Sequence, residues 1–249
     1  MRRFTVLLLV LVCFSGCVIL HNHQSAKLYP KSKTQGEIVV HQNYRLAYSE
    51  THEGALWVQY KLNADMLSGL AQRKDNFRSD PNVTSGSASP DDYRGSGYDR
   101  GHLCPAASMS YNQHAMDETF YMSNMAPQVP GLNRGRWKTL EEHEREWTAK
   151  YGKMHVVTGP VYRQIIETIG ENEIAVPAQY YKIIWNGSDR IIAFLMPNQK
   201  CENGLKWYAV PVDSVEVLTG FNFFSIIPNK IENNIEAIVD FDYWFSEKN

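Results

Sequence analysis

The chain has 249 residues, of which 43% are apolar, and this is enough to build one sizeable core in a single domain. Its 14 tyrosines, 10 phenylalanines and 6 tryptophans exclude a disordered chain of low hydrophobicity. The formal net charge of -2 excludes a strong positive field over the whole molecule. Any affinity for phosphate must therefore come from a local basic patch or from a metal ion.

The N-terminus has the pattern of an export signal. Two arginines precede an apolar run over residues 5–14, which is too short to span a bilayer comfortably. The following Ser15-Gly16-Cys17 resembles the lipobox of bacterial lipoproteins. This predicts a signal peptide at 1–16, a lipid on Cys17 and anchoring in the bacterial cell envelope, on either the periplasmic or the surface face. The alternatives are an ordinary secretory signal cleaved near Gly16 and a retained membrane helix.

Residues 17–35 are polar and lack periodicity, so we expect a lipidated tether ahead of one domain at 36–249. Patterns typical of strands occur at 38–40, 44–48, 55–62, 154–162, 180–185 and 190–196. The last two flank a predicted hairpin turn at 186–189. The sequence therefore predicts an α+β domain in which helices flank a mainly antiparallel central sheet.

Two further segments have local signals. Residues 80–97 are rich in serine, glycine, proline and aspartate, which predicts a loop. Asp213 and Glu216 have the spacing of a capping box, which predicts a short helix that starts there and ends before Gly220.

Polar side chains at a four-residue spacing mark the central region. Asn133, Glu141 and Arg145 would share one flank of a helix, because each step of four residues turns that flank by only about 40°. An adjoining apolar stripe would seat this helix on the sheet: Trp137, Leu140, Trp147 and Tyr151. An amide, a carboxylate and a guanidinium along one edge have no evident packing purpose, but they suit a hydrated metal ion and a phosphate.

Five motifs carry a resemblance to a known family. They are RKDNFR at 73–78, YDRGH at 98–102, NMAPQ at 124–128, NRGRWKTLE at 133–141 and VEVLTGFNFF at 215–224. In this order and spacing, the chain from residue 57 to residue 224 resembles the DNA/RNA non-specific endonucleases of the ββα-metal (His-Me) superfamily. The resemblance implies a ββα-metal core.

The resemblance implies roles for three residues of the metal region. His102 would be the general base, which suits an imidazole because it is largely neutral at physiological pH. Asn133 would be the one direct protein ligand of Mg²⁺, with Mn²⁺ as a substitute, and Glu141 would hold metal-bound waters. A helix N-cap is the structural alternative for Asn133, and a solvated helix charge is the alternative for Glu141.

The resemblance also assigns the arginines. Arg73 and Arg145 would pair with phosphate oxygens, while Arg100 would serve structure as much as phosphate. Asn124 is expected to be scaffold. A local basic patch would attract the substrate: Arg73, Lys74, Arg78, Arg134, Arg136 and Lys138.

The expected activity is magnesium-dependent hydrolysis of DNA and RNA with little sequence preference, which leaves 5′-phosphate and 3′-hydroxyl ends. Two rival interpretations are a non-catalytic nucleic-acid-binding lipoprotein and a structural envelope lipoprotein. The expected partners are DNA, RNA and, through Cys17, the lipid bilayer, while a homodimer and a protein inhibitor stay open. Cys104 and Cys201 either form a disulfide or are two separately buried thiols.

Overall fold

The structure is a computed structural model that describes residues 29–33 and 36–246. The predicted signal peptide, Cys17 and most of the predicted tether lie outside the described residues. Within the described ranges, no helix combines the length and the apolar character that a membrane span requires.

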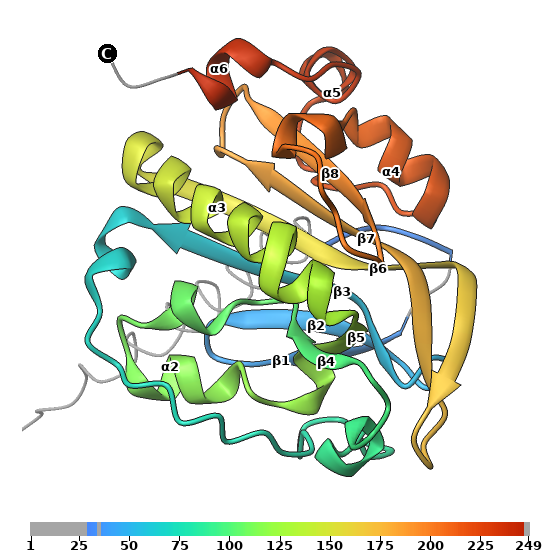
Figure 1. Cartoon of the computed structure of the whole chain (residues 1–249). Coiled ribbons are helices and arrows are strands. Elements are labelled where there is room, and N and C mark those ends of the chain that lie inside the picture. Colours follow the sequence, from blue (N-terminus) through green and yellow to red (C-terminus); the bar gives the residue numbers. More distant parts are fainter. Residues whose placement is uncertain (1–28, 34–35, 247–249) are drawn as a thin grey trace, which may run out of the picture.

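Seven antiparallel strands form the central sheet, in the order β1-β2-β3-β6-β7-β8-β9. Their bounds are β1 Glu37–Val40, β2 Tyr44–Ser49, β3 Gly54–Asn63, β6 Lys153–Ile169, β7 Ile174–Trp185, β8 Ile191–Pro197 and β9 Ala209–Val210. All the predicted strands are present, and β6 and β7 extend beyond their predicted lengths to form a long ribbon. The predicted α+β class with a mainly antiparallel sheet is confirmed (Figure 1).

Both faces of the sheet are covered. Side chains of successive strand residues point to opposite faces, so neighbouring residues of one strand belong to different core clusters. On β6, Val156 belongs to the core cluster that also contains Trp137, Leu140 and Trp147. Its neighbour Val157 belongs to a second cluster beneath α4 (Val212–Thr219). Helix α3 (Lys138–Tyr151) therefore covers one face and α4 covers the other (Figure 1).

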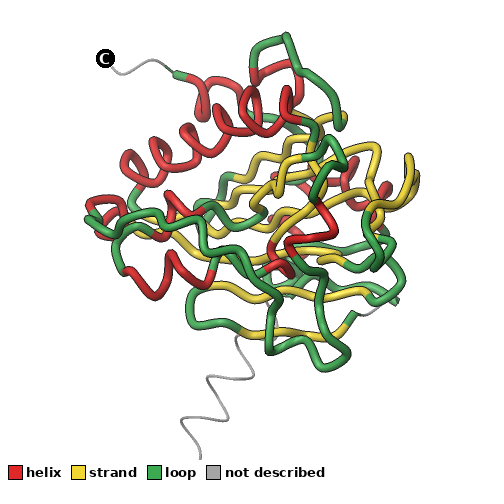
Figure 2. The backbone as a smooth tube through the Cα atoms, turned by 60° about the horizontal axis from the view of Figure 1, so that its bottom comes forward, coloured by secondary structure: helices red, strands yellow, loops and turns green. Residues whose placement is uncertain are grey.

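The segment that holds the predicted site is inserted between two neighbouring strands. Asn63 at the end of β3 pairs with Lys153 at the start of β6, so residues 64–152 leave the sheet and return to the adjacent position. The segment contains α2 (Gln113–Glu118), α3 and a two-stranded ribbon of β4 (Asp99–His102) and β5 (Met125–Gln128). Loops and short helices make up much of the rest, as Figure 2 shows.

Two local predictions are wrong. The predicted helix through residues 133–145 is broken: a π-helical turn, η5 (Leu132–Trp137), precedes α3, and the non-helical backbone of Gly135 separates the two. Helix α4 has Pro211 as its N-cap, with no side-chain cap, so Asp213 lies in the first turn and no capping box forms. The predicted loop at 80–97 holds one short 3₁₀ helix at Pro90–Tyr93.

The two cysteines in the described residues are separate buried thiols, Cys104 and Cys201. Burial raises the pKa of the Cys104 thiol well above its usual value. Because both thiols are free, Cys104 and Cys201 do not form a disulfide, which was one of the two alternatives from the sequence.

A buried ion pair joins α3 to the sheet. Lys182 on β7 donates to Glu144 on α3 at 2.8 Å, and both side chains are fully buried. Tyr60 on β3 also donates to Glu144, at 2.8 Å, and Ser108 donates to its other oxygen at 3.3 Å. Both oxygens of the carboxylate are thus hydrogen-bonded, which is the condition under which a buried charge is tolerated.

We expect Lys182→Met to destabilise the protein by about 3–5 kcal/mol, because it leaves the Glu144 carboxylate buried without its positive partner. The double variant Lys182→Met/Glu144→Leu should regain much of that loss. The exposed pair of Lys138 and Glu142 is the matched control, and Lys138→Met should cost less than about 1 kcal/mol. Urea unfolding measures all three. A single Lys182→Met variant as stable as wild type would contradict this energetic role.

Candidate active site

His102 ends β4 and is held on several sides. Its Cα pairs with Met125 of β5, and its carbonyl oxygen accepts a hydrogen bond from the Trp137 indole at 3.4 Å. The ring contacts Phe120 edge-on at a centroid distance of 4.9 Å and Phe77 at 5.8 Å. A Cβ at the preceding Gly101 would collide with the Gln128 side chain, which explains the need for glycine there.

The environment of His102 keeps its imidazole neutral. The residue is 8% exposed, and its Nε2 atom is buried without a hydrogen-bond partner among the described residues. Burial, together with the positive charges of Arg73 and Arg100, lowers the pKa of His102 to about 3. The ring is therefore an unprotonated base with one buried nitrogen that needs a water or ligand partner.

This lowered pKa predicts acid destabilisation. Below about pH 6.5 the unfolded chain takes up a proton on His102, whereas the folded protein resists protonation down to about pH 3, so the free energy of unfolding falls across that window. The non-titrating variant His102→Phe should lose this part of the slope in urea titrations between those pH values. His114→Gln, at an exposed histidine, should keep it. Parallel slopes for wild type and His102→Phe would contradict the assignment.

Asn133 is fixed beside the same ribbon. Its Nδ2 atom donates to the Asp99 carboxylate at 2.9 Å, and Asp99 opens the strand that His102 ends. Gly131 is the N-cap of the η5 turn and no side-chain cap is present, so Asn133 is not an N-cap. The hydrogen bond orients the amide with its nitrogen toward Asp99, which leaves the amide oxygen as a ligand for a hard cation.

Glu141 and Arg145 lie one turn apart on α3. Burial raises the pKa of Glu141 to about 7, against the opposing charges of Lys182, Arg145 and Arg73. The Nη1 atom of Arg145 is buried without a partner among the residues the structure describes. Glu141 is thus a partly buried carboxyl that a cation would ionise, and Arg145 has an unused donor that an anion would satisfy.

Arg73, from the loop after β3, and Arg100, two residues before His102 on β4, place positive charge beside the histidine. The guanidinium of Arg73 lies 5.1 Å from the Phe120 ring centroid and pairs with Asp75 at 2.6 Å, while its side chain is 53% exposed. That of Arg100 lies 4.1 Å from the Phe77 ring centroid. The structure therefore brings both arginines to the two aromatic rings that contact His102.

Much of the predicted basic patch is already engaged. Arg78 donates to two main-chain oxygens and stacks on Tyr121 at 3.9 Å, so it is mainly structural. Arg134 makes a two-point ion pair with Asp99, at 2.6 and 2.8 Å. Arg136 donates to the Glu202 carbonyl at 3.3 Å, and Lys138 pairs with Glu142 at 3.6 Å. The patch is consequently weaker than its sequence indicates.

Asn124 has the expected scaffold position. Its side chain accepts a hydrogen bond from the Cys104 amide at 2.8 Å and donates to the carbonyls of Cys104 and Thr119 at 2.9 and 2.8 Å. These bonds hold the chain just after His102.

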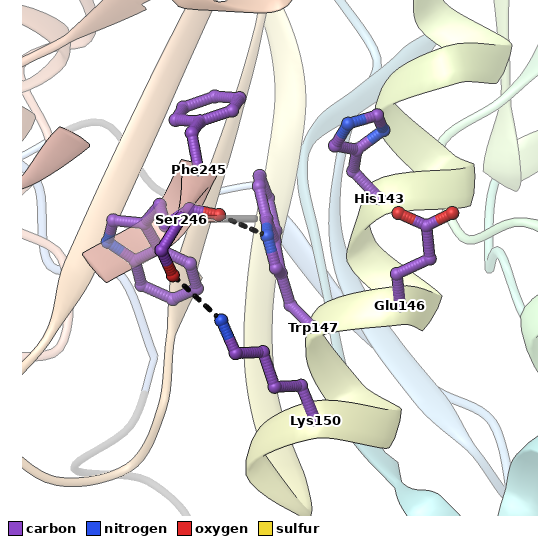
Figure 3. A pocket seen from close by; sticks show the side chains of 7 residues that line it. His143, Glu146, Trp147, Lys150, Phe245 and Ser246 are labelled. Atoms are coloured by element: carbon purple, nitrogen blue, oxygen red, sulfur yellow. Dashed lines mark hydrogen bonds between the residues drawn. The ribbon is translucent and has the colours of Figure 1, made fainter. Parts of the chain in front are cut away.

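His143 lies away from these groups, as expected for a structural histidine. Its Nδ1 atom lies 3.1 Å from the Thr139 carbonyl, and its ring packs against Trp147. Figure 3 shows it at a separate hollow between α3 and α6 (Phe241–Phe245), where Lys150 donates to Ser246 at 2.9 Å. This hollow contains none of the predicted site residues.

Sequence reasoning assigned no role to Asp99, Phe77 or Phe120. The YDRGH motif contains Asp99, and its position three residues before His102 on a strand was the available signal for a group on the same ribbon. Phe77 lies in the RKDNFR motif, whereas nothing in the sequence marks Phe120 as a wall of the site.

Comparison with known proteins identifies the family. The chain matches the family model for DNA/RNA non-specific endonucleases over residues 23–230. It is 37% identical over 206 residues to mitochondrial endonuclease G of Homo sapiens, which covers 76% of this chain and 68% of that protein. It is 34% identical over 218 residues to a nuclease of Nostoc sp., with coverage of 82% and 78%.

A solved structure agrees. The crystal structure of the EndoG/EndoGI complex contains a chain that matches with a TM-score of 0.74 and 34% identity, over 79% of this chain and 89% of that chain. The fold, the family match and the relatives together show that this chain belongs to the DNA/RNA non-specific endonuclease family and is a hydrolase that acts on nucleic acids.

Proposed function

We propose that the protein is a magnesium-dependent endonuclease that cleaves DNA and RNA at phosphodiester bonds without sequence preference, and that His102 is its general base. The observation that carries this proposal is the neutral His102 ring, on the same strand that anchors Asn133 through Asp99. One buried nitrogen of this ring has no hydrogen-bond partner in the part of the chain that the structure describes. A base for water and an oxygen ligand for a hard cation are thereby tied to one short ribbon.

The residues fit a divalent cation. Asn133 would supply the direct oxygen ligand, and Glu141 would accept hydrogen bonds from coordinated waters. When bound, Mg²⁺ supplies positive charge at the phosphate and an acidic water for the leaving 3′-oxygen, and Mn²⁺ can substitute for it. The single neutral protein ligand suits Mg²⁺, which keeps most of its waters in protein sites.

The chain's own groups perform the remaining tasks. His102 accepts the proton of the attacking water, and its exclusion from solvent keeps competing protons away. Arg73 and Arg145 pair with the phosphate oxygens as negative charge gathers on them, and Arg145 already has an unused buried donor. Arg100 supports the site by stacking on Phe77 and by keeping the histidine neutral. Contacts to phosphate carry no base information, so cleavage should be nearly independent of sequence.

A plasmid-nicking assay with and without Mg²⁺ tests this proposal. Nicking should require the cation, and end-labelled DNA and RNA of several sequences should yield 5′-phosphate and 3′-hydroxyl ends. Cleavage in the presence of EDTA, cleavage at one short recognition sequence or 5′-hydroxyl products would overturn it.

We also propose that the protein is exported and anchored by lipid on Cys17. The basic start, the short apolar run and Ser15-Gly16-Cys17 support this. Cys17→Ser should move the protein from the membrane fraction to the soluble fraction. Cys13→Ser is the matched control, because Cys13 lies in the segment that processing would remove, and it should leave sedimentation unchanged. A Cys17→Ser protein that still sediments with membranes at the processed size would refute lipid anchoring through Cys17.

A further inference from the structure

A cluster of carboxylates lies on the other face of the sheet from His102. Asp213 and Glu216 lie on α4, and Glu236 directly follows α5 (Asn229–Ile235). One carboxylate oxygen from each of the three lies within 4.8 Å of the others. Figure 1 shows α4 and α5 near each other in the C-terminal part of the chain, whereas His102 lies on the β4–β5 ribbon. The cluster is therefore separate from the nuclease site.

Glu236 needs a partner that the described part of the chain does not supply. It is 2% exposed, and its buried Oε1 atom makes no hydrogen bond with any residue that the structure describes. Burial raises the pKa of Glu236 to about 9, and the negative charges of Glu216, Glu232 and Asp213 act in the same direction. Within residues 29–33 and 36–246, none of the ion pairs involves Asp213, Glu216 or Glu236. A buried carboxylate in this position must hold either a proton or a cation.

Glu216 can still bind a cation, although its carboxylate already accepts one hydrogen bond. One of its oxygens accepts a hydrogen bond from the Phe223 amide at 2.8 Å, which fixes the side chain against the loop after α4. Asp213 is exposed and opens the cluster to solvent, so an ion can enter from that side. Glu236 is thus buried, Glu216 is oriented by its hydrogen bond, and Asp213 is accessible to solvent.

We propose that Asp213, Glu216 and Glu236 bind a calcium ion that ties α4 to the end of α5. Carboxylate oxygens are the ligands of this hard cation, and its flexible coordination accepts water for the remaining positions. A mutual spacing within 4.8 Å lets one oxygen from each of the three carboxylates contact a single ion, at the metal–oxygen distances of about 2.3–2.6 Å that calcium adopts. The ion holds the C-terminal segment on the second core cluster and takes no part in catalysis.

Thermal and urea unfolding with EDTA and then with added CaCl₂ test the proposal. At free calcium of about 100 times the dissociation constant, the unfolding equilibrium constant should fall about 100-fold. Asn133→Ala, which removes the proposed catalytic ligand, should keep the whole calcium response. Glu236→Gln and Asp213→Asn should lose it. Asp242→Asn, at an exposed carboxylate on α6, makes the same charge change outside the cluster and should keep it.

The outcomes separate a cation from a proton. If Glu236 only holds a proton, calcium will not stabilise the wild type, and this would overturn the proposal. A calcium response that survives in folded Asp213→Asn would also overturn it, and this exposed variant remains informative if Glu236→Gln does not fold. Titration calorimetry with CaCl₂ should show the cluster site in wild type and in Asn133→Ala, and this site should be absent in Asp213→Asn. Loss of nicking activity bears only on the nuclease site.

Discussion

Replacing His102 by alanine should lower the turnover number by about 10²–10⁴-fold, the usual contribution of a positioned general base. The variant keeps Asn133, Asp99 and Glu141, so Mg²⁺ and DNA should still bind. Imidazole added to the buffer should restore part of the activity, because the space between Phe77 and Phe120 is shaped for that ring. Single-turnover cleavage measured with and without imidazole gives both quantities.

The matched control for this experiment is His143→Ala. His143 also lies in the inserted segment, but it packs beside Trp147 at the separate hollow between α3 and α6. Its loss should leave turnover close to wild type and insensitive to imidazole. Near-wild-type turnover in a folded His102→Ala protein would remove the assignment of His102 as the base.

Asn133→Ala should impair cleavage through weaker metal binding, not through loss of the base. Loss of the proposed direct ligand should lower activity and shift the Mg²⁺ dependence to higher concentrations, and imidazole should give no rescue. The measurement is the cleavage rate as a function of Mg²⁺ concentration, alongside a thermal melt. Unchanged metal dependence in a folded Asn133→Ala protein would refute the ligand assignment.

Arg134→Ala provides the matched control for Asn133→Ala. Arg134 and Asn133 share Asp99 as their hydrogen-bond acceptor, so both variants disturb that carboxylate, but only one removes an amide oxygen. Metal dependence should therefore stay normal in Arg134→Ala. An equal shift in both variants would mean that Asp99, and not the Asn133 amide, controls metal affinity.

Much of the fold was predictable because strands and buried stripes leave local patterns. The alternation over 55–62 became β3, and the predicted apolar stripe became a buried face, with Trp137 at the end of η5 and Leu140 and Trp147 on α3 in the core. The break at Gly135 was not predictable, because the four-residue spacing from Asn133 to Glu141 is compatible with a regular helix. The predicted capping box of α4 was also wrong. The spacing of Asp213 and Glu216 fits a capping box, but Pro211 is the N-cap and no side chain forms a cap hydrogen bond.

The motifs were enough to predict which residues group around His102. The sequence could not predict the burial and ion pairing of residues whose partners lie far away in the chain. Nothing in the sequence distinguishes Glu144 from the neighbouring glutamates of the helix, yet Lys182 and Tyr60, from two strands far away in sequence, make it a buried ion. The same holds for the basic patch, in which Asp99 and Tyr121 already engage Arg134 and Arg78. The roles of His102 and Asn133 rest on the family motif together with the ribbon that holds both.

The insertion of residues 64–152 between β3 and β6 has a consequence for folding. Pairing Asn63 with Lys153 closes a loop of roughly 90 residues, which costs about 2 kcal/mol more entropy than a loop of about 10 residues. The closure becomes favourable only when contacts such as those of Glu144 with Tyr60 and Lys182 form at the same time. The central strand pair and the cleavage site should therefore assemble together in one slow step, because their contacts are distant in sequence.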